Sequence, residues 1–319
     1  MIARSTRNIV LQFDPAADVL PGGKRLSGGI SAAVAIADTL WLTHDETVAI
    51  ERLSAERTKA ASFRYASHRR FDLRDLVSLP APRGKAKHAS PPEADFEGIS
   101  FCGDYLWVAG SHSAVRDDLG KKKGSEAIAA LATVRRSGNR FLLARIPVAG
   151  RDAQPALVRQ LGTKDGQVLR AARLAGGRKQ NALTRALRDD PHLGPFLSIP
   201  SKDNGFDIEG LAAAPNGRLF LGLRGPVLDG WACILEIHVA ARLDRNNELT
   251  LRKSPDHPLA PPRERYIAST SWTSAVRGSA ISAAQVATCS YSPVRQCEER
   301  ESPRFDAGMT RSRTTARRY

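Results

Sequence analysis

Residues 207–225, which read DIEGLAAAPNGRLFLGLRG, carry the pattern on which our interpretation of the fold depends. A strand of small apolar residues runs into the Asn216-Gly217 pair, which supplies the positive φ angles that a tight two-residue turn requires. Residues 219–221 (LFL) then form a short continuous apolar run, typical of a strand that is covered on both faces. The stretch therefore predicts a β-hairpin whose return strand is buried.

The same pattern occurs at two earlier places in the chain. Residues 95–112 read DFEGISFCGDYLWVAGSH, and residues 31–43 read SAAVAIADTLWLT. A β-rich segment follows each hairpin, and we expect it to be the outer strand of its unit: Thr47–Leu53, Phe141–Val148 and Ala232–Val239. Small sheets repeated around an axis make a propeller. The sequence thus predicts an all-β, β-propeller-like repeat of small antiparallel sheets with its last blade missing, and a β-sandwich is the alternative.

Two segments interrupt the β pattern. Residues 125–136 and 167–188 are rich in Ala, Leu and Arg, and spacings such as Val168, Ala171 and Leu174 predict helical insertions between blades. We assign residues 1–25 to an N-terminal arm and residues 26–266 to an incomplete β-propeller-like domain.

The last segment, residues 267–319, has no period of 2 or 3.6 and is interpreted as an out-of-frame tail. Read from the third base of each codon, Trp272-Thr273 yields only Asp, and GC-rich codons give VDLVDLRGPRVGDLCRAGGDLLVFSGPT for the shifted product. That string repeats the blade pattern of strand, Gly-Gly-Asp turn and apolar strand. We therefore expect residues 268–319 to be disordered and the chain to be marginally stable, because a missing unit leaves strand edges unpaired.

Composition restricts the partners and the compartment. No run of about 20 apolar residues occurs, so we expect no membrane span, and the N-terminus lacks the apolar stretch of a signal peptide. We therefore expect a cytoplasmic protein. Its four cysteines include no C-x-x-C pair, so we expect free, buried thiols rather than a zinc or redox site. The net charge of +15 is scattered without interleaved aromatic residues, and we expect no specific nucleic-acid partner.

Two Asp-x-Glu-Gly motifs are the main candidates for chemistry. Asp95 and Glu97, and likewise Asp207 and Glu209, lie on the same face of their strand by the period of 2. If both strands are innermost, these carboxylates converge near the central channel, and hard oxygen ligands of this kind suit Ca²⁺. The first repeat has Ala32 where Glu would stand, so the ring is incomplete. The alternative is that each Glu caps a turn or bonds a neighbouring strand.

Other polar residues have two interpretations each. His112 is a candidate general base or a turn residue that bonds the backbone. Ser111 lies outside any G-x-S-x-G motif, so we consider it a ligand contact rather than a nucleophile. Arg224 suits an anionic ligand or an ion pair with the motif carboxylates. Lys202 and Asn204 lie in a turn before a strand, which also suits a ligand loop.

A set of motifs across about residues 26–266 carries a resemblance to a known family. The motifs are LWLTHDET (40–47), DFEGI (95–99), LW (106–107) with GSHS (110–113), FLLARIP (141–147), LTRALRDDP (183–191), PSKDNGFDIEGL (200–211) and LGLRGPVL (221–228). With these, the chain resembles the bacterial family catalogued as domain of unknown function 3616, which implies a propeller-like fold and no established activity. The closing segment of that family, rich in DLL and GPT, resembles the shifted frame. The Glu-Gly motif is also similar to that of calcium-dependent lactonase and phosphotriesterase propellers, and loosely to phytase-like esterase propellers.

Two functions remain open from the sequence. The first is a binding or scaffold protein with a small-molecule or protein ligand on the channel face. The frameshift could also have made this particular chain a non-functional form of such a protein. The second is a Ca²⁺-dependent hydrolase of phosphoesters or lactones, with the four motif carboxylates as metal ligands and His112 as base. We favour the first, because the ring of ligands is incomplete and no nucleophile motif is present.

Resequencing the gene tests the frameshift. We expect a one- or two-base insertion or deletion between the codons of about Pro262 and Ala268, since the blade pattern continues in another frame beyond that point. An uninterrupted frame that related genes share through this region would contradict the interpretation.

Overall fold

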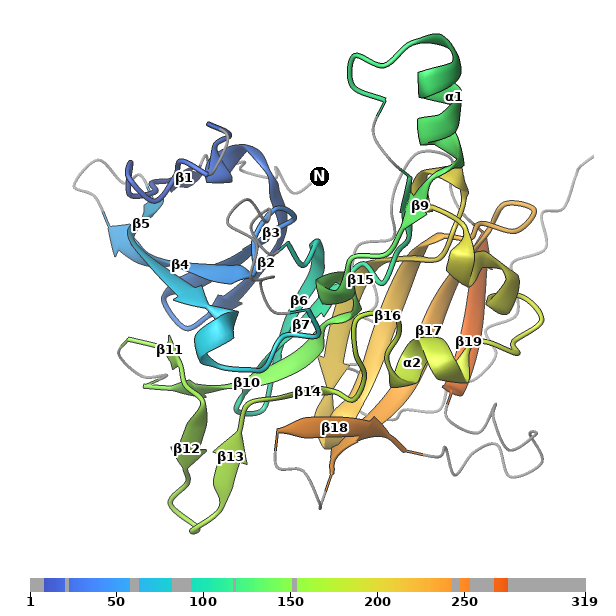
Figure 1. The fold of residues 1–319 in the computed structure, drawn as a ribbon. Coiled ribbons are helices and arrows are strands. Elements are labelled where there is room, and N and C mark those ends of the chain that lie inside the picture. The colour runs from blue at the N-terminus through green and yellow to red at the C-terminus, as the bar shows by residue number, and fades with distance from the viewer. Residues whose placement is uncertain are drawn as a thin grey trace, which may run out of the picture.

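A computed structural model describes residues 9–20, 23–57, 63–81, 93–116, 119–150, 154–242, 247–252 and 267–274. Strands dominate, and the α-helices within these ranges are α1 (Gly124–Ala132) and α2 (Ala182–Ala186). Three β-units follow one another across the molecule, with unit 1 in blue, unit 2 in teal and green, and unit 3 in yellow to orange (Figure 1). The fold is all-β and propeller-like, as the sequence predicts.

Unit 1 is a five-stranded sheet with the strand order β1-β5-β4-β3-β2. Its strands are β1 (Ile9–Leu11), β2 (Ile30–Ile36), β3 (Thr39–His44), β4 (Ala49–Arg57) and β5 (Phe63–Asp72). Strand β1 lies parallel to β5, whereas the other pairs are antiparallel. Part of the segment that the sequence assigned to an N-terminal arm is therefore a strand of this sheet.

Units 2 and 3 share one ten-stranded sheet. Unit 2 comprises β6 (Phe96–Cys102), β7 (Tyr105–Gly110), β10 (Leu143–Ala149) and β14 (Ala172–Leu174). Unit 3 comprises β15 (Asp207–Ala214), β16 (Arg218–Gly225), β17 (Trp231–Ala241), β18 (Glu248–Leu251) and β19 (Ile267–Ser274). Strands β14 and β18 run parallel and join the two units.

The remaining strands are short. They are β8 (Val115–Arg116), which pairs with β9 (Val134–Arg135); β11 (Ala156–Leu157), which pairs with β10; and β12 (Gln160–Gly162), which pairs with β13 (Val168–Arg170). Helix α1 stands away from the body of the molecule between β8 and β9 (Figure 1).

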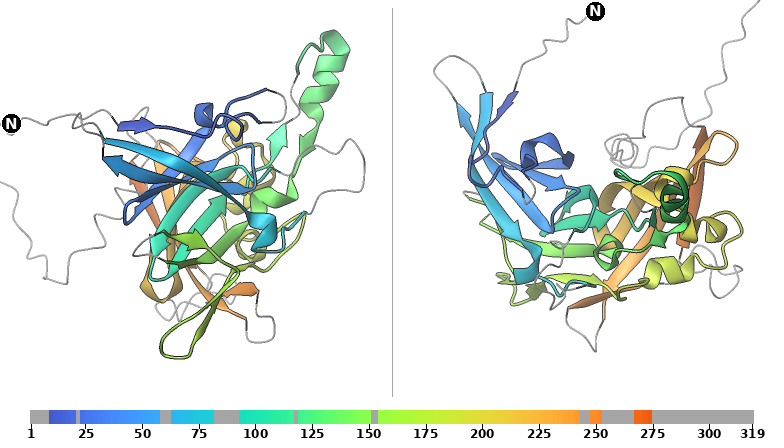
Figure 2. Two further views of the ribbon diagram at one scale, coloured as in Figure 1. Left: turned by 90° about the vertical axis from the view of Figure 1, so that its left-hand side faces the viewer. Right: turned by 45° about the horizontal axis from the view of Figure 1, so that its top comes forward.

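The innermost strands are β2, β6 and β15. Each lies at the end of the hydrogen-bonded strand order of its sheet, and β6 packs along β2 on one side and along β15 on the other. Units 1 and 3 accordingly lie on opposite sides of unit 2 (Figure 2). These strands are the first halves of the three sequence repeats, so the repeats do place their first strands at the centre.

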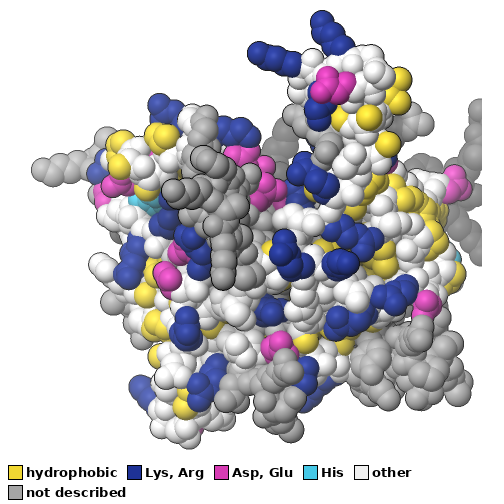
Figure 3. Space-filling view, in the orientation of Figure 1, with side chains coloured by type: hydrophobic (Ala, Val, Ile, Leu, Met, Phe, Trp, Pro, Cys, Tyr) yellow, Lys and Arg dark blue, Asp and Glu magenta, His cyan; other side chains and the backbone are white. Residues whose placement is uncertain are grey.

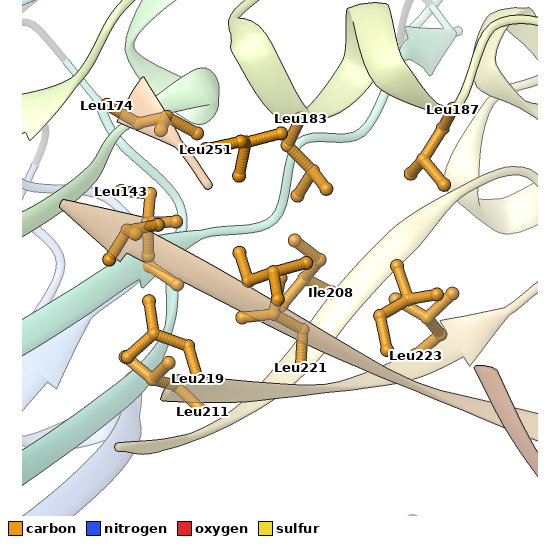
Figure 4. Packing of buried hydrophobic residues seen from close by; sticks show 14 of the residues in the cluster. Leu143, Leu174, Leu183, Leu187, Ile208, Leu211, Leu219, Leu221, Leu223 and Leu251 are labelled. Carbon is orange, nitrogen blue, oxygen red and sulfur yellow. The ribbon is translucent and has the colours of Figure 1, made fainter. Parts of the chain in front are cut away.

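Both faces of unit 2 are buried. In β7, Trp107 and Ala109 belong to the apolar cluster shared with unit 3, whereas Leu106 and Val108 belong to the cluster shared with unit 1. The continuous apolar run of β7 in the sequence therefore indicates a strand that is covered on both faces. Figure 4 shows the first of these clusters, in which residues of β16 such as Leu221 lie opposite Leu183 of α2.

Gly98 allows two inner strands to approach. A Cβ atom at this position would lie 2.6 Å from Cβ of Leu211 and 3.0 Å from its backbone nitrogen, on the neighbouring strand β15. The glycine of the Asp-x-Glu-Gly motif is thus a packing requirement between units.

One predicted helix is mostly wrong. Residues 168–174 form β13 and β14 rather than a helix. Ala171 packs in the cluster with unit 1, and Leu174 packs in the cluster with unit 3, so their spacing reflects burial on two faces. The helix begins only at Ala182, where Asn181 accepts the Thr184 amide and its own amide bonds the Thr184 hydroxyl. The other predicted helix is confirmed by α1.

Two strand predictions also need correction. The expected outer strands are β4, β10 and β17, and each has a further strand beside it: β5, β14 and β19. Strand β5 was missed because its sequence, FRYASHRRFD, lacks a continuous apolar run. The first residues of the segment expected to be disordered form β19, antiparallel to β17. The rest of that segment, residues 275–319, lies outside the described residues, as do Cys289 and Cys297.

The free cysteines of the described part are Cys102 and Cys233, and burial raises the pKa of both thiols, to about 12 for Cys233. Neither α1 nor α2 has the length and apolarity that a membrane-crossing helix needs.

The Gly98→Ala substitution tests the packing of the inner strands. We expect it to lower the free energy of unfolding by about 1–3 kcal/mol, because the added methyl group overpacks the contact with β15. Urea denaturation measures the change. Gly162→Ala is the matched control, since that strand glycine has no heavy atom within 4 Å of the added Cβ, and we expect a change of less than about 1 kcal/mol. Equal effects of the two substitutions would contradict the packing role.

Candidate functional site

Backbone hydrogen bonds bring the three units together at one end of the inner strands. The amide of Asp95 donates to the carbonyl of Asp45 in unit 1 at 3.0 Å, and the amide of Ser111 donates to the carbonyl of Asp95 at 3.0 Å. The amide of Ile208 in unit 3 then donates to the carbonyl of Ser111 at 2.8 Å. The two Asp-x-Glu-Gly motifs are therefore anchored to each other across units.

A β-bulge re-aims the motif glutamates. The register of β6 against β7 shifts between Phe96 and Gly98, and that of β15 against β16 shifts between Ile208 and Gly210. Glu97 and Glu209 are the residues left unpaired by these shifts, and a bulge commonly turns such a side chain toward a site. The motif thus encodes the same distortion twice.

Unit 1 has the same bulge with different side chains. The register of β2 against β3 shifts between Ile30 and Ala32, so Ser31 is the counterpart of the two glutamates. The expectation that Ala32 takes this position was wrong by one residue, because sequence alignment cannot place a bulge. The Ser31 hydroxyl donates to the carbonyl of Phe96 on the neighbouring inner strand. Gly29 accordingly stands where the other units have aspartate.

The four motif carboxylates approach one another. The charges of Asp95, Glu209 and Asp207 all act on Glu97. Two arginines offset part of this negative charge. The guanidinium of Arg224 contacts both Asp207 and Glu209, and that of Arg140 contacts Asp95. The four carboxylates therefore interact electrostatically, and Arg224 pairs with the carboxylates of its own unit.

Glu97 differs from the other three carboxylates. It has no hydrogen bond or ion pair within the part of the chain that the structure describes. Burial, and then the charges of Asp95, Glu209 and Asp207, raise the pKa of Glu97 to about 8. Burial also raises the pKa of Asp207, to about 7, although Arg224 opposes that shift. At neutral pH, Glu97 is a largely protonated carboxylic acid among carboxylates.

The carboxylate cluster does not fit a calcium ion in this arrangement. Among the described residues, no group of three or more His, Cys, Asp or Glu side chains is placed to hold a metal. Arg224 already contacts two of the four candidate ligands. A calcium site needs six to eight oxygen ligands, and this geometry leaves too few of them free.

His112 lies in the interior. It is 2% exposed, its Nδ1 lies 2.7 Å from the carbonyl oxygen of Gly110, and its Nε2 lies 2.7 Å from Nδ2 of Asn181. Burial lowers the pKa of His112 to about 4, so the ring is neutral at pH 7. This geometry suits the structural interpretation of His112, because both ring nitrogens are occupied and no substrate can reach them.

The other sequence candidates lie around the cluster. Ser111 is fully buried, and its hydroxyl is 2.9 Å from that of Ser113. Asn204 bonds the backbone of Val227 with both side-chain atoms, at 2.9 and 3.2 Å, and thereby ties the turn before β15 to the loop after β16. Lys202 is exposed in the same turn. No side-chain hydrogen bond or ion pair joins any of these three described residues to a motif carboxylate, although the Ser111 backbone bonds that of Asp95.

A cavity of about 350 Å³ lies in unit 1, and none of the four motif carboxylates is among its lining residues. Lys24, His44, Asp45 and Glu46 are among the residues that line it. The cavity neighbours the cluster's segment through one contact, in which the backbone carbonyl of Asp45 accepts the amide of Asp95. His44 is 3% exposed, and its Nε2 has no hydrogen-bond partner among the described residues.

Sequence reasoning missed two cationic residues of this region. Arg140 contacts Asp95, bonds the Ser113 hydroxyl at 2.9 Å and bonds Glu93 at 2.9 Å. Lys24 pairs with Glu46 at the mouth of the cavity. Arg140 directly precedes the FLLARIP motif (141–147), but nothing in the sequence relates it or Lys24 to the acidic residues, so only the fold brings the two cations to this region.

Comparison with known families gives one match. A family model described as "Protein of unknown function (DUF3616)" matches residues 29–267. The search of curated proteins found no match.

The Glu97→Gln substitution tests the raised pKa. Because the folded-state pKa exceeds the unfolded value, protonation of Glu97 stabilises the wild type fully below about pH 4.5, and this contribution is lost as the pH rises through about 8. We therefore expect the variant to gain stability relative to the wild type as the pH rises through this window. The gain is about 1–3 kcal/mol at pH 8.5 after allowance for solvent screening.

Urea denaturation at pH 5 and at pH 8.5 measures the difference. Glu126→Gln is the control, since Glu126 is exposed on α1, remote from the cluster, and its replacement should leave the pH profile of the wild type unchanged. A parallel pH profile for Glu97→Gln and the wild type would show that Glu97 ionises normally.

Proposed function

This chain belongs to the family described as Protein of unknown function (DUF3616), and from that premise we propose that it is a ligand-binding protein of propeller-like fold. The proposed ligand is a small cationic molecule that carries an ammonium group. Its site is the carboxylate cluster at the end of the inner strands, together with the adjoining cavity in unit 1.

The state of Glu97 is the observation that carries the proposal. A half-buried carboxyl group without a partner costs stability, because burial and three neighbouring carboxylates disfavour its charged form. A bound cation would reverse this cost by pairing with the ionised group. Ionisable groups whose pKa is strongly shifted in this way are concentrated at functional sites.

The chemistry of the cluster favours a nitrogen cation over a metal ion. Arg224 already places one nitrogen cation against Asp207 and Glu209, and its side chain is 51% exposed. An ammonium group can pair with Glu97 while this arrangement stays in place, since it needs only a few acceptors rather than a complete oxygen shell.

The cavity suits the rest of such a ligand. Asp45 and Glu46 supply further carboxylates, while Lys24 and Arg25 supply donors for hydroxyl or carbonyl groups. A volume of about 350 Å³ is within the range of small-molecule sites. A ligand that spans the cavity and the cluster would therefore meet acids at both ends.

The calcium-dependent hydrolase of phosphoesters or lactones has less support. The four carboxylates do not form a calcium site, and the proposed base, His112, is buried with both ring nitrogens engaged. Ser111 is buried beside it and bonds Ser113. The binding function requires neither a metal ion nor a base.

Titration with 1,4-diaminobutane at pH 7 tests the binding function. We expect a rise in melting temperature for the wild type and the release of close to one proton per bound diamine, because Glu97 must ionise to pair with the ammonium group. Calorimetry in two buffers of different ionisation enthalpy measures the released protons. In Glu97→Gln, the proton release should disappear and the affinity for the diamine should fall at least tenfold. Glu126→Gln should behave as the wild type.

Calcium chloride is the second arm of the same experiment. A melting-temperature rise with Ca²⁺ that Glu209→Gln abolishes, without a response to the diamine, would replace the proposal by the metal-dependent alternative. Absence of a response to either probe would remove the cluster as a binding site.

A further inference from the structure

A second pocket lies between helix α2 and the segment that follows it, away from the carboxylate cluster. Its volume is about 220 Å³, and it is lined by Arg136, Phe141, Gln180, Thr184, Arg188 and Ser198, among others. The lining contains two arginines and no carboxylate. Lys and Arg side chains also gather around α2 and the strands beside it on the surface (Figure 3).

The two arginines are held in place without being neutralised. Arg136 donates to the carbonyl of Leu197 at 3.1 Å, and Arg188 donates to Oε1 of Gln180 at 2.6 Å. Neither guanidinium has an ion pair within the described ranges. Each guanidinium has five N–H donors, so most of its donors are free for a ligand.

One nearby acid, Asp190, is engaged by the backbone. Oδ1 of Asp190 accepts the amides of His192 and Leu193, at 2.9 and 2.8 Å, and so closes the turn after α2. That turn brings Gly194 against the carbonyl of Arg188, where a Cβ atom would clash with the backbone. The glycine thus allows this wall of the pocket to approach the end of α2.

The floor of the pocket is rigid. Thr184 bonds Asn181 through the capping interaction of α2, and Asn181 in turn bonds the carbonyl of Phe141 at 2.9 Å and the ring of His112. His112 also packs edge-on against Phe141. All of these residues are buried, so the pocket is largely formed before any ligand arrives.

We propose that this pocket binds a small phosphate-bearing anion, with Arg136 and Arg188 as its two cationic contacts. Guanidinium groups match phosphate oxygens in bidentate geometry, and the hydroxyls of Thr184 and Ser198 add polar contacts at the floor and rim. The size of the pocket suits a phosphate monoester of a few carbons. A nucleic-acid strand needs a long basic track instead.

Calorimetric titration with inorganic phosphate and with glycerol 1-phosphate in 50 mM NaCl tests the site. We expect both probes to bind the wild type, the ester more tightly than inorganic phosphate, because it fills more of the pocket. In the Arg136→Gln/Arg188→Gln double variant, the affinity for both probes should fall at least tenfold. Arg185→Gln is the matched control, since Arg185 is exposed on α2, three residues before Arg188, and does not line the pocket, and it should bind as the wild type does.

Three outcomes would overturn the inference: no binding by the wild type, equal loss in Arg185→Gln and in the double variant, or unchanged affinity in the double variant. Thermal unfolding of each variant without ligand shows whether it folds. Acetate at the same concentration separates phosphate recognition from general attraction of anions, and equal binding of acetate would also count against the site. The diamine titration concerns a different pocket and the opposite charge, so either proposal can fail alone.

Discussion

The close approach of the three inner strands is the constraint on which the rest of the structure depends. Strand β6 lies between β2 and β15, and at Gly98 there is no room for a side chain against β15. A small sheet cannot bury its own faces, so unit 2 depends on unit 1 for one side of β7 and on unit 3 for the other. Apolar packing between units therefore adds to the packing within unit 3 in stabilising the fold.

This packing also brings negatively charged carboxylates together at the centre of the molecule, where they repel one another. Inner strands that lie side by side bring their bulged residues close together, and two of these residues are glutamates that each lie two residues after an aspartate, of which Asp207 is buried. Arg224 and Arg140 offset part of the charge, and Glu97 has no hydrogen bond or ion pair with any residue that the structure describes. A site of this kind is a consequence of the architecture, because the repeated motif places the same chemistry at the centre of more than one unit.

The prediction from sequence succeeded where local and tertiary requirements agree. The hairpins at residues 95–112 and 207–225 combine turn residues with an apolar return strand, and both strand pairs formed as expected. The turn at Asn216-Gly217 has three residues, Pro215–Gly217, rather than the predicted two. The prediction failed at residues 168–174, where two-sided burial has the same spacing as a helix, and in unit 1, where the bulge falls at Ser31 rather than at Ala32. His112 shows the same limit, since a histidine in a polar motif can as easily bond the protein interior as face a substrate.

The sequence by itself determined the all-β class and the family, because hairpin turns, apolar strands and the quoted motifs are properties of residue types at fixed spacing. Only the tertiary structure decided which charges meet. Arg140, Lys24 and Arg136 lie outside the quoted motifs, and Arg188 lies in one (183–191) whose pattern does not indicate a pocket. Burial, which shifts the pKa of Glu97 and of His112, likewise depends on how the units pack. Desolvation and charge pairing depend on distances through space, and the order of residues along the chain does not specify them.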